Sequence, residues 1–279
     1  MIKRHLPHTA IGTNNPLFNL EIKRVRFAET PDRLARYTRW ALVVGTVIVT
    51  LVMAGILESS RGYITYALGE SVLFRFVVIG VLAEVVLDIA CMVGGLGVVR
   101  NEITISNAML GVGMAVRLSN IVAAKHALVQ ARAWRVMVLV IALRLGVMIV
   151  FLLDILSYGA LLTDLSVLLP LAVMGILSVI YLIEPFWRMS AVSAVSLMIS
   201  TYIHNRAVAF LAAFFAIVLL WTVLIVIVAA LMWISTLAGI AIICLPISFF
   251  GFIGGIWIFY RWLREWALGR TRLRLHNLD

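Results

Sequence analysis

The sequence predicts an all-α fold: a polytopic integral membrane protein with six transmembrane helices, an N-terminal interfacial helix and both termini in the cytoplasm. The first observation is composition, because the 279-residue chain is 63% hydrophobic and only 13% charged, against about 25% charged residues in a soluble domain. The second is a set of six apolar stretches, most of them near the roughly 20 residues that a bilayer span requires. The third is the distribution of the 23 lysines and arginines, most of which lie in four clusters between those stretches.

Basic clusters and connections poor in basic residues alternate along the chain. Lysine and arginine accumulate in the short cytoplasmic loops of membrane proteins, so the clusters predict cytoplasmic segments and the connections predict outer loops. The clusters occupy residues 1–39, 100–135, 185–207 and 261–279, and the connections lie near 58–70, 154–164 and 234–237, where Arg61 is the only basic residue. The predicted spans between them cover residues 40–57, 71–99, 136–156, 165–184, 208–231 and 239–260.

This alternation divides the chain into three regions. A cytoplasmic arm with an interfacial elbow helix, 1–39, is followed by the transmembrane domain, 40–260, and by a basic cytoplasmic tail, 261–279. The largest cytoplasmic piece inside the transmembrane domain is 100–135.

Local signals justify individual helix starts. Asn15-Pro16 and Thr30-Pro31-Asp32 each place a capping side chain before a proline at the first helical position. Segment 16–28 mixes apolar and basic residues, which favours a helix lying at the membrane interface; a solvated arm is the alternative. Ser119 is a predicted N-cap, and a helix running from there through the third span would be about 55 Å long and would extend into the cytoplasm.

Four charged residues interrupt the predicted spans: Arg75, Glu84, Asp88 and Arg144. Each costs roughly 2.5–3.5 kcal/mol at mid-span on insertion scales, so such residues pair or face a water-filled cavity. Glu84 and Asp88 share a helix face, and Asp88 lies at nearly the predicted depth of Arg144. We expect Arg144 to pair with Asp88, with Glu84 as a further partner, and Arg75 to extend towards the outer loop. Such pairs either fix the helix register or act in a transport path, and the sequence leaves both interpretations open.

Closely spaced glycines give a packing signal in the sixth span. Gly251 and Gly255 are four residues apart, a spacing that permits close approach of two helices. Packing within the chain is the simpler interpretation, and a dimer interface is the alternative.

Several function classes lack support in the sequence. It contains no HExxH motif, nucleophile elbow or P-loop, so we expect no enzyme activity, cofactor or metal site. The histidines lie outside the predicted spans, and Cys91 and Cys244 fit apolar packing. The net charge of +10 lies at predicted membrane edges, so the expected partners are anionic lipid headgroups of the bilayer and not nucleic acid.

The order of these parts resembles that of the membrane subunits of ABC-2-type transporters. The similar motifs are Asn15-Pro16-Leu17-Phe18 with Glu21, Arg100 with Glu102 after the second span, and Ile121-Val122 with Lys125 before the third. The resemblance implies an elbow helix before the first span and a cytoplasmic coupling region that docks onto a separate ATPase. The residues implied for that coupling are Arg100, Glu102, Ser106, Arg117 and Lys125.

The expected function is therefore that of a permease subunit of an ABC-2-like exporter in the plasma (bacterial inner) membrane. It would work as a homo- or heterodimer and couple ATP hydrolysis on separate chains to transport of a lipid, glycan or hydrophobic compound. One alternative is a structural or assembly subunit of a larger membrane complex. Another is an ion-coupled secondary transporter that uses Glu84 and Asp88.

Overall fold

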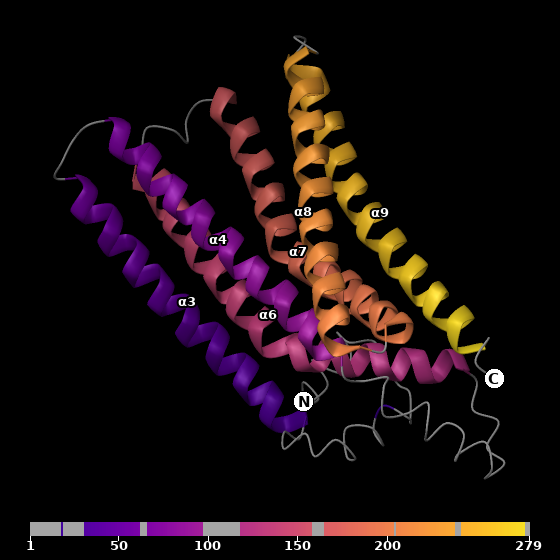
Figure 1. Cartoon of the computed structure of the whole chain (residues 1–279). Coiled ribbons are helices and arrows are strands. Elements are labelled where there is room, and N and C mark those ends of the chain that lie inside the picture. Colours follow the sequence, from indigo (N-terminus) through magenta and orange to yellow (C-terminus); the bar gives the residue numbers. More distant parts are fainter. Residues whose placement is uncertain are drawn as a thin grey trace. The chain divides into compact units, whose positions relative to one another are not determined.

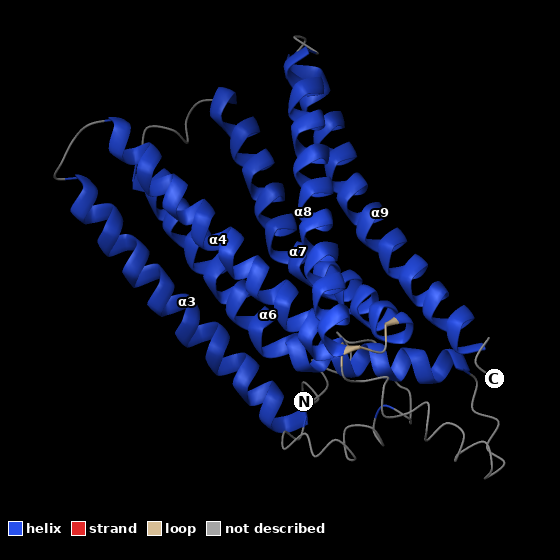
Figure 2. Cartoon of the chain, viewed as in Figure 1, coloured by secondary structure: helices blue, strands red, loops and turns tan. Residues whose placement is uncertain are grey.

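In a computed structural model, the described part of the chain contains six long α-helices (Figure 1). The structure describes Phe18 and residues 31–61, 66–96, 118–157, 165–203, 205–237 and 241–276. In these residues it contains helices and no strand (Figure 2), which confirms the all-α prediction for this part of the chain. The helices are α3 (Pro31–Arg61), α4 (Tyr66–Gly95), α6 (Leu118–Ser157), α7 (Leu165–Tyr202), α8 (Arg206–Leu237) and α9 (Ala241–His276).

Four of these helices contain stretches long and apolar enough to cross a membrane. A search of the described residues finds them at Leu34–Gly55, Asn120–Val150, Ser178–Tyr202 and Ala207–Val226, on α3, α6, α7 and α8. Large apolar side chains are exposed along one face of α3, including Trp40, Val47 and Leu51, and along α8, including Phe215 and Leu219. A face of this kind is stable in lipid and unfavourable in water, so both composition and exposure indicate a membrane protein.

Contacts between α-carbons divide the chain into two compact units. Among the described residues, the first contains those of 31–87 and 134–186, and the second contains those of 88–133 and 187–276. Helices α4, α6 and α7 each contribute residues to both units.

In the first unit, α3 packs along α6 in a parallel direction. Trp134 donates its indole N–H to the Thr38 hydroxyl over 2.9 Å. Further along both helices, Val49 packs against Gly146. In the same unit α7 runs antiparallel to α6, because Trp134 contacts Phe186 whereas Arg144 contacts Tyr181. These directions are those of the first, third and fourth spans of a chain that crosses the membrane alternately.

In the second unit, α4 and α7 run parallel and α6 runs against them. The Ser196 hydroxyl donates to the Met92 carbonyl over 2.8 Å. Arg132 donates to the Gly94 carbonyl over 2.9 Å. Because the last carbonyls of a helix have no partner within it, Arg132 completes the end of α4. Helix α8 packs against α9.

The helix bounds confirm some predictions and correct others. α3 begins at Pro31, as the proline signal predicts, and α6 has 40 residues, close to the predicted long third helix. The predicted cytoplasmic loop 185–207 is wrong, because α7 continues to Tyr202 and residues 191–197 are all buried. The basic tail is also helical, since α9 extends to His276.

Some predicted segments lie outside the described residues. Apart from Phe18, which is helical and buried, they include the interfacial helix at 16–28. They also include residues 100–117, the part of the predicted region 100–135 that precedes α6.

The α3–α6 contact gives a packing prediction. A Cβ at Gly146 would lie 2.5 Å from Cγ1 and 2.7 Å from Cβ of Val49, and Val49 cannot relieve the second contact by rotating its side chain. We expect Gly146→Ala to destabilise the protein by about 1–3 kcal/mol. The measurement is the apparent free energy of unfolding in detergent.

Gly55→Ala is the matched control, because a Cβ there meets no atom of the described residues within 4 Å and alanine favours helix by up to about 1 kcal/mol. Equal stability of the two variants would contradict the proposed close approach of α3 and α6.

Candidate functional site

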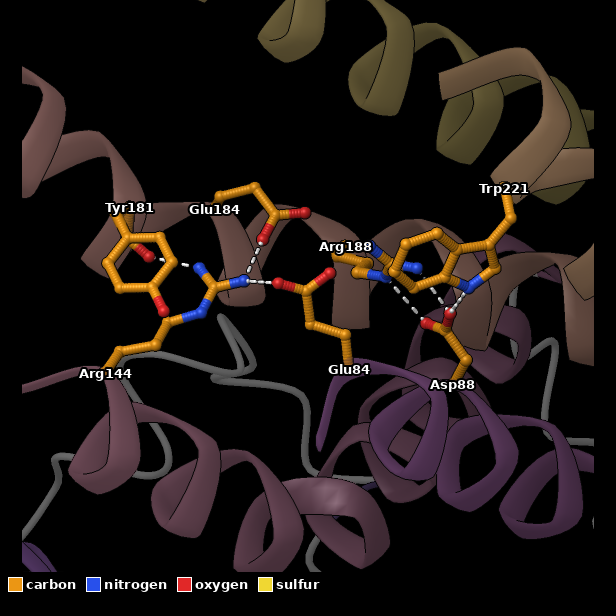
Figure 3. Close-up of polar contacts among 7 residues, drawn as sticks. All are labelled: Glu84, Asp88, Arg144, Tyr181, Glu184, Arg188 and Trp221. Atoms are coloured by element: carbon orange, nitrogen blue, oxygen red, sulfur yellow. Dashed lines mark hydrogen bonds and ion pairs between the residues drawn. The ribbon is translucent and has the colours of Figure 1, made fainter. Parts of the chain in front are cut away.

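Two clusters of charged side chains lie among the helices (Figure 3). The Arg144 cluster consists of Glu84, Arg144, Tyr181 and Glu184 and belongs to the first unit. The Asp88 cluster consists of Asp88, Arg188 and Trp221 and belongs to the second. Together they use side chains from α4, α6, α7 and α8.

In the Arg144 cluster, one guanidinium joins three helices. Arg144 comes from α6 and is only 2% exposed. Its Nη2 donates to Glu184 Oε2 on α7 over 2.8 Å and to Glu84 Oε1 on α4, while its Nη1 donates to the Tyr181 backbone carbonyl. The Tyr181 ring covers the guanidinium, with 4.3 Å from Arg144 Cζ to the ring centroid. Cation–π contact and two charge-assisted hydrogen bonds replace the water that this cation loses.

Pro185 explains why the Tyr181 carbonyl is available to Arg144. Pro185 lies inside α7, and proline has no N–H to donate to the carbonyl four residues earlier. That carbonyl belongs to Tyr181. Arg144 supplies the missing donor from another helix, so the guanidinium repairs the break that the proline makes in the hydrogen bonding of α7.

In the Asp88 cluster, the carboxylate is fully enclosed by three donors. Arg188 donates from Nε to Asp88 Oδ1 over 2.9 Å and from Nη2 to Oδ2 over 2.6 Å, a two-pronged geometry that is strong and directional. Trp221 on α8 donates its indole N–H to Oδ2 over 3.0 Å. Its ring also lies 4.2 Å from Arg188 Cζ. Asp88 is 0% exposed and Arg188 1%, so neither charge has water as an alternative partner.

The ion pairs in the structure agree only in part with the predicted ones. It brings Arg144 and Glu84 together, as expected for the further partner. Asp88, the first expected partner of Arg144, instead has an ion pair with Arg188. Sequence reasoning missed Glu184 and Arg188, because the predicted fourth span ended at residue 184. The signal that could have found them is their spacing, because Glu184 and Arg188 are four residues apart and flank Pro185.

The residues predicted for other roles have different positions. Lys125 is buried, at 5% exposed, so it lies inside the protein and not on a docking surface. A Cβ at Gly255 would meet nothing within 4 Å in the described part of the chain, which does not support packing within the chain at that residue. Predicted residues outside the described set are Arg100, Glu102, Ser106 and Arg117, together with the side chain of Arg75 and the surroundings of Gly251.

Within the described residues, no group of three or more His, Cys, Asp or Glu side chains is placed to hold a metal ion. Comparison with protein-family models, curated proteins and solved structures finds no match for this chain. The chemistry of the site is that of buried ion pairs that join apolar helices.

The Asp88 cluster gives a prediction about stability. Arg188→Met leaves the Asp88 carboxylate buried without its cation, and we expect a loss of about 3–5 kcal/mol. The double variant Asp88→Leu/Arg188→Met removes both charges and should recover most of that loss. Denaturant unfolding in detergent measures both.

The exposed pair Arg261–Glu265, with both side chains about 60% exposed, supplies the control. Arg261→Gln should change the unfolding free energy by less than about 1 kcal/mol. If the double variant is no more stable than Arg188→Met alone, the unpaired Asp88 carboxylate does not cause the loss of stability, and the prediction is wrong.

The Arg144–Pro185 relationship gives a second prediction. Pro185→Ala restores an N–H for the Tyr181 carbonyl, so Arg144→Met should be less destabilising in that background by about 1 kcal/mol, the worth of one hydrogen bond. A double-mutant cycle measures the difference. Replacing Pro185→Ala by Gly55→Ala in the cycle should give additive effects, within about 0.5 kcal/mol; additivity in both cycles would refute the role assigned to Arg144.

Proposed function

We propose that the chain is the membrane-spanning permease subunit of an ABC-2-like exporter. It would have six spans with both termini in the cytoplasm, reside in the plasma (bacterial inner) membrane and function as a dimer with separate ATPase chains. The transported compound would be a lipid, a glycan or another hydrophobic molecule.

The observation that carries this proposal is the enclosure of charges inside a bundle of apolar helices. Ionisable residues at membrane depth are expensive, and they mark transport pathways or the elements that move during transport. Here Asp88, Arg144 and Arg188 are buried on helices that contain membrane-spanning stretches or belong to predicted spans. Such pairs are exchangeable contacts, because each guanidinium can keep part of its bonding while it changes carboxylate partners.

Helix lengths and connectivity support the coupling part of the proposal. With 40 residues, α6 is about 60 Å long, roughly twice the thickness of the hydrocarbon core. Helix α4, which carries Glu84 and Asp88, leads towards the predicted cytoplasmic coupling region 100–135. Displacement of that segment by an ATPase would therefore act on both carboxylates through one helix.

Pro185 supplies a place where this displacement can be absorbed. Proline inside a helix removes a backbone hydrogen bond and permits bending, and the second unit begins on α7 at Trp187, two residues after Pro185. In this mechanism Arg144 holds the Tyr181 carbonyl in one arrangement of α7 and releases it in the other.

A second candidate function is that of a structural subunit in a larger membrane complex. The complete pairing of the Asp88 carboxylate, with both oxygens bonded and no exposure, favours it, since a rigid pair also fixes helix register. The two functions differ in whether an ATPase binds and in whether its activity depends on this chain.

The test is purification of the full-length protein from native membranes in a mild detergent, followed by identification of bound chains. We expect a P-loop ATPase, and we expect deletion of residues 106–117 or Glu102→Ala to abolish ATPase binding or stimulation. Arg261→Gln is the control and should retain both.

An ATPase that stays bound and stimulated after deletion of 106–117 would refute the coupling role of that segment. Recovery of only non-ATPase membrane proteins would favour the structural subunit.

A further inference from the structure

The C-terminal part of α9 presents an unusually basic surface. The helix continues past the predicted end of the sixth span, and between residues 261 and 274 it carries five arginines and a single carboxylate, Glu265. Arg261 donates to Glu265 over 3.1 Å, so that carboxylate already has a cation. Arg264, Arg270 and Arg272 are exposed, and none of them has an ion pair within the described part of the chain.

Aromatic side chains place this part of α9 at the depth of lipid headgroups. Trp257, Trp262 and Trp266 are all exposed, Trp262 by 58%, and the rings of Trp262 and Trp266 stack with centroids 6.2 Å apart. Tryptophan is enriched where the hydrocarbon meets the headgroups, because its ring is apolar and its N–H is polar. Exposed tryptophans interleaved with arginines are typical of that zone.

Two of the unpaired arginines border a hollow in the protein surface. The hollow has a volume of about 350 Å³ and is lined by Arg264, Glu265, Leu268 and Arg272. Leu268 follows Arg264 by four residues and precedes Arg272 by four, so the three share one face of the helix. The lining thus combines two guanidinium groups, the apolar side chain of Leu268 and the carboxylate of Glu265, which already accepts a hydrogen bond from Arg261.

We propose that this hollow binds the headgroup of an anionic phospholipid in the cytoplasmic leaflet, a position that rests on the topology proposed above. Guanidinium groups recognise phosphate oxygens with paired hydrogen bonds, and the Leu268 side chain in the lining can contact the glycerol and the first carbons of the acyl chains. A zwitterionic choline headgroup would bring its own cation towards Arg264 and Arg272 and would bind less well. The surface thereby selects lipids by net charge.

The experiment measures lipid binding to the full-length protein in detergent by native mass spectrometry. Phosphatidylglycerol and phosphatidylcholine with identical acyl chains are the probes. We expect the wild type to prefer phosphatidylglycerol, and we expect Arg264→Gln/Arg272→Gln to reduce that preference about 30-fold, because each basic residue near an anionic lipid surface contributes roughly a fivefold factor. Arg39→Gln/Arg270→Gln is the charge-matched control, since both residues are exposed and neither lines the hollow.

Three results would overturn the proposal. They are no lipid preference in the wild type, an unchanged preference in Arg264→Gln/Arg272→Gln, or an equal loss in the control pair. Displacement of the lipid by millimolar inorganic phosphate would likewise show a site for small anions and not for lipid. Association with an ATPase is measured separately, so failure of the lipid site and failure of the proposed transport function remain distinguishable.

Discussion

Arg144 sets the central constraint on the first unit, because a guanidinium without water requires several acceptors at once. It obtains them from α4 and α7: two carboxylates, one backbone carbonyl and one aromatic face. The carbonyl is free only because Pro185 lacks an N–H. A proline that would weaken α7 and an arginine that would be expelled from lipid thus stabilise each other. Without Pro185, Arg144 would lose one of its acceptors, and without Arg144 the Tyr181 carbonyl would lose its donor.

The second unit also has to satisfy a charged group that is shut off from water, but there the group is an anion. There the enclosed group is a carboxylate, Asp88, and its donors come from Arg188 on α7 and Trp221 on α8. Glu84 and Asp88 lie one turn apart on α4, and Glu184 and Arg188 one turn apart on α7. Helices α4 and α7 therefore each carry one charged side chain of either cluster, and Arg144 comes from α6. A rotation or shift of α4 or of α7 would disturb one ion pair in each cluster. This coupling makes the clusters suited to a protein that changes between two arrangements, and it equally fixes the register of a rigid one.

Much of the helical architecture could be predicted from the sequence, because apolar stretches of bilayer length and prolines at helix starts act locally. The start of α3 at Pro31 and the length of α6 are examples. The pairing of the charges could not be predicted to the same degree. Depth estimates along separate helices, uncertain by several residues, did not separate Asp88 from Glu84 as the partner of Arg144. A fourth span that ends at residue 184 also places Arg188 outside the membrane, although α7 continues to Tyr202.

The basic residues of the clusters act in two separate ways, first on the topology during membrane insertion and then through their contacts in the folded protein. Positive charge biases which side of the membrane a segment faces during insertion, and this effect depends on sequence position alone. The folded protein then uses those cations selectively. Arg188 is enclosed by Asp88 and Trp221, Arg132 completes the end of α4, and Lys125 is buried. These residues have partners or lie inside the protein, so they are not available to an external anion. Arg264 and Arg272 on α9 are exposed and without an ion pair among the described residues, and charge that remains unpaired at the predicted membrane edge is what an anionic partner can recognise.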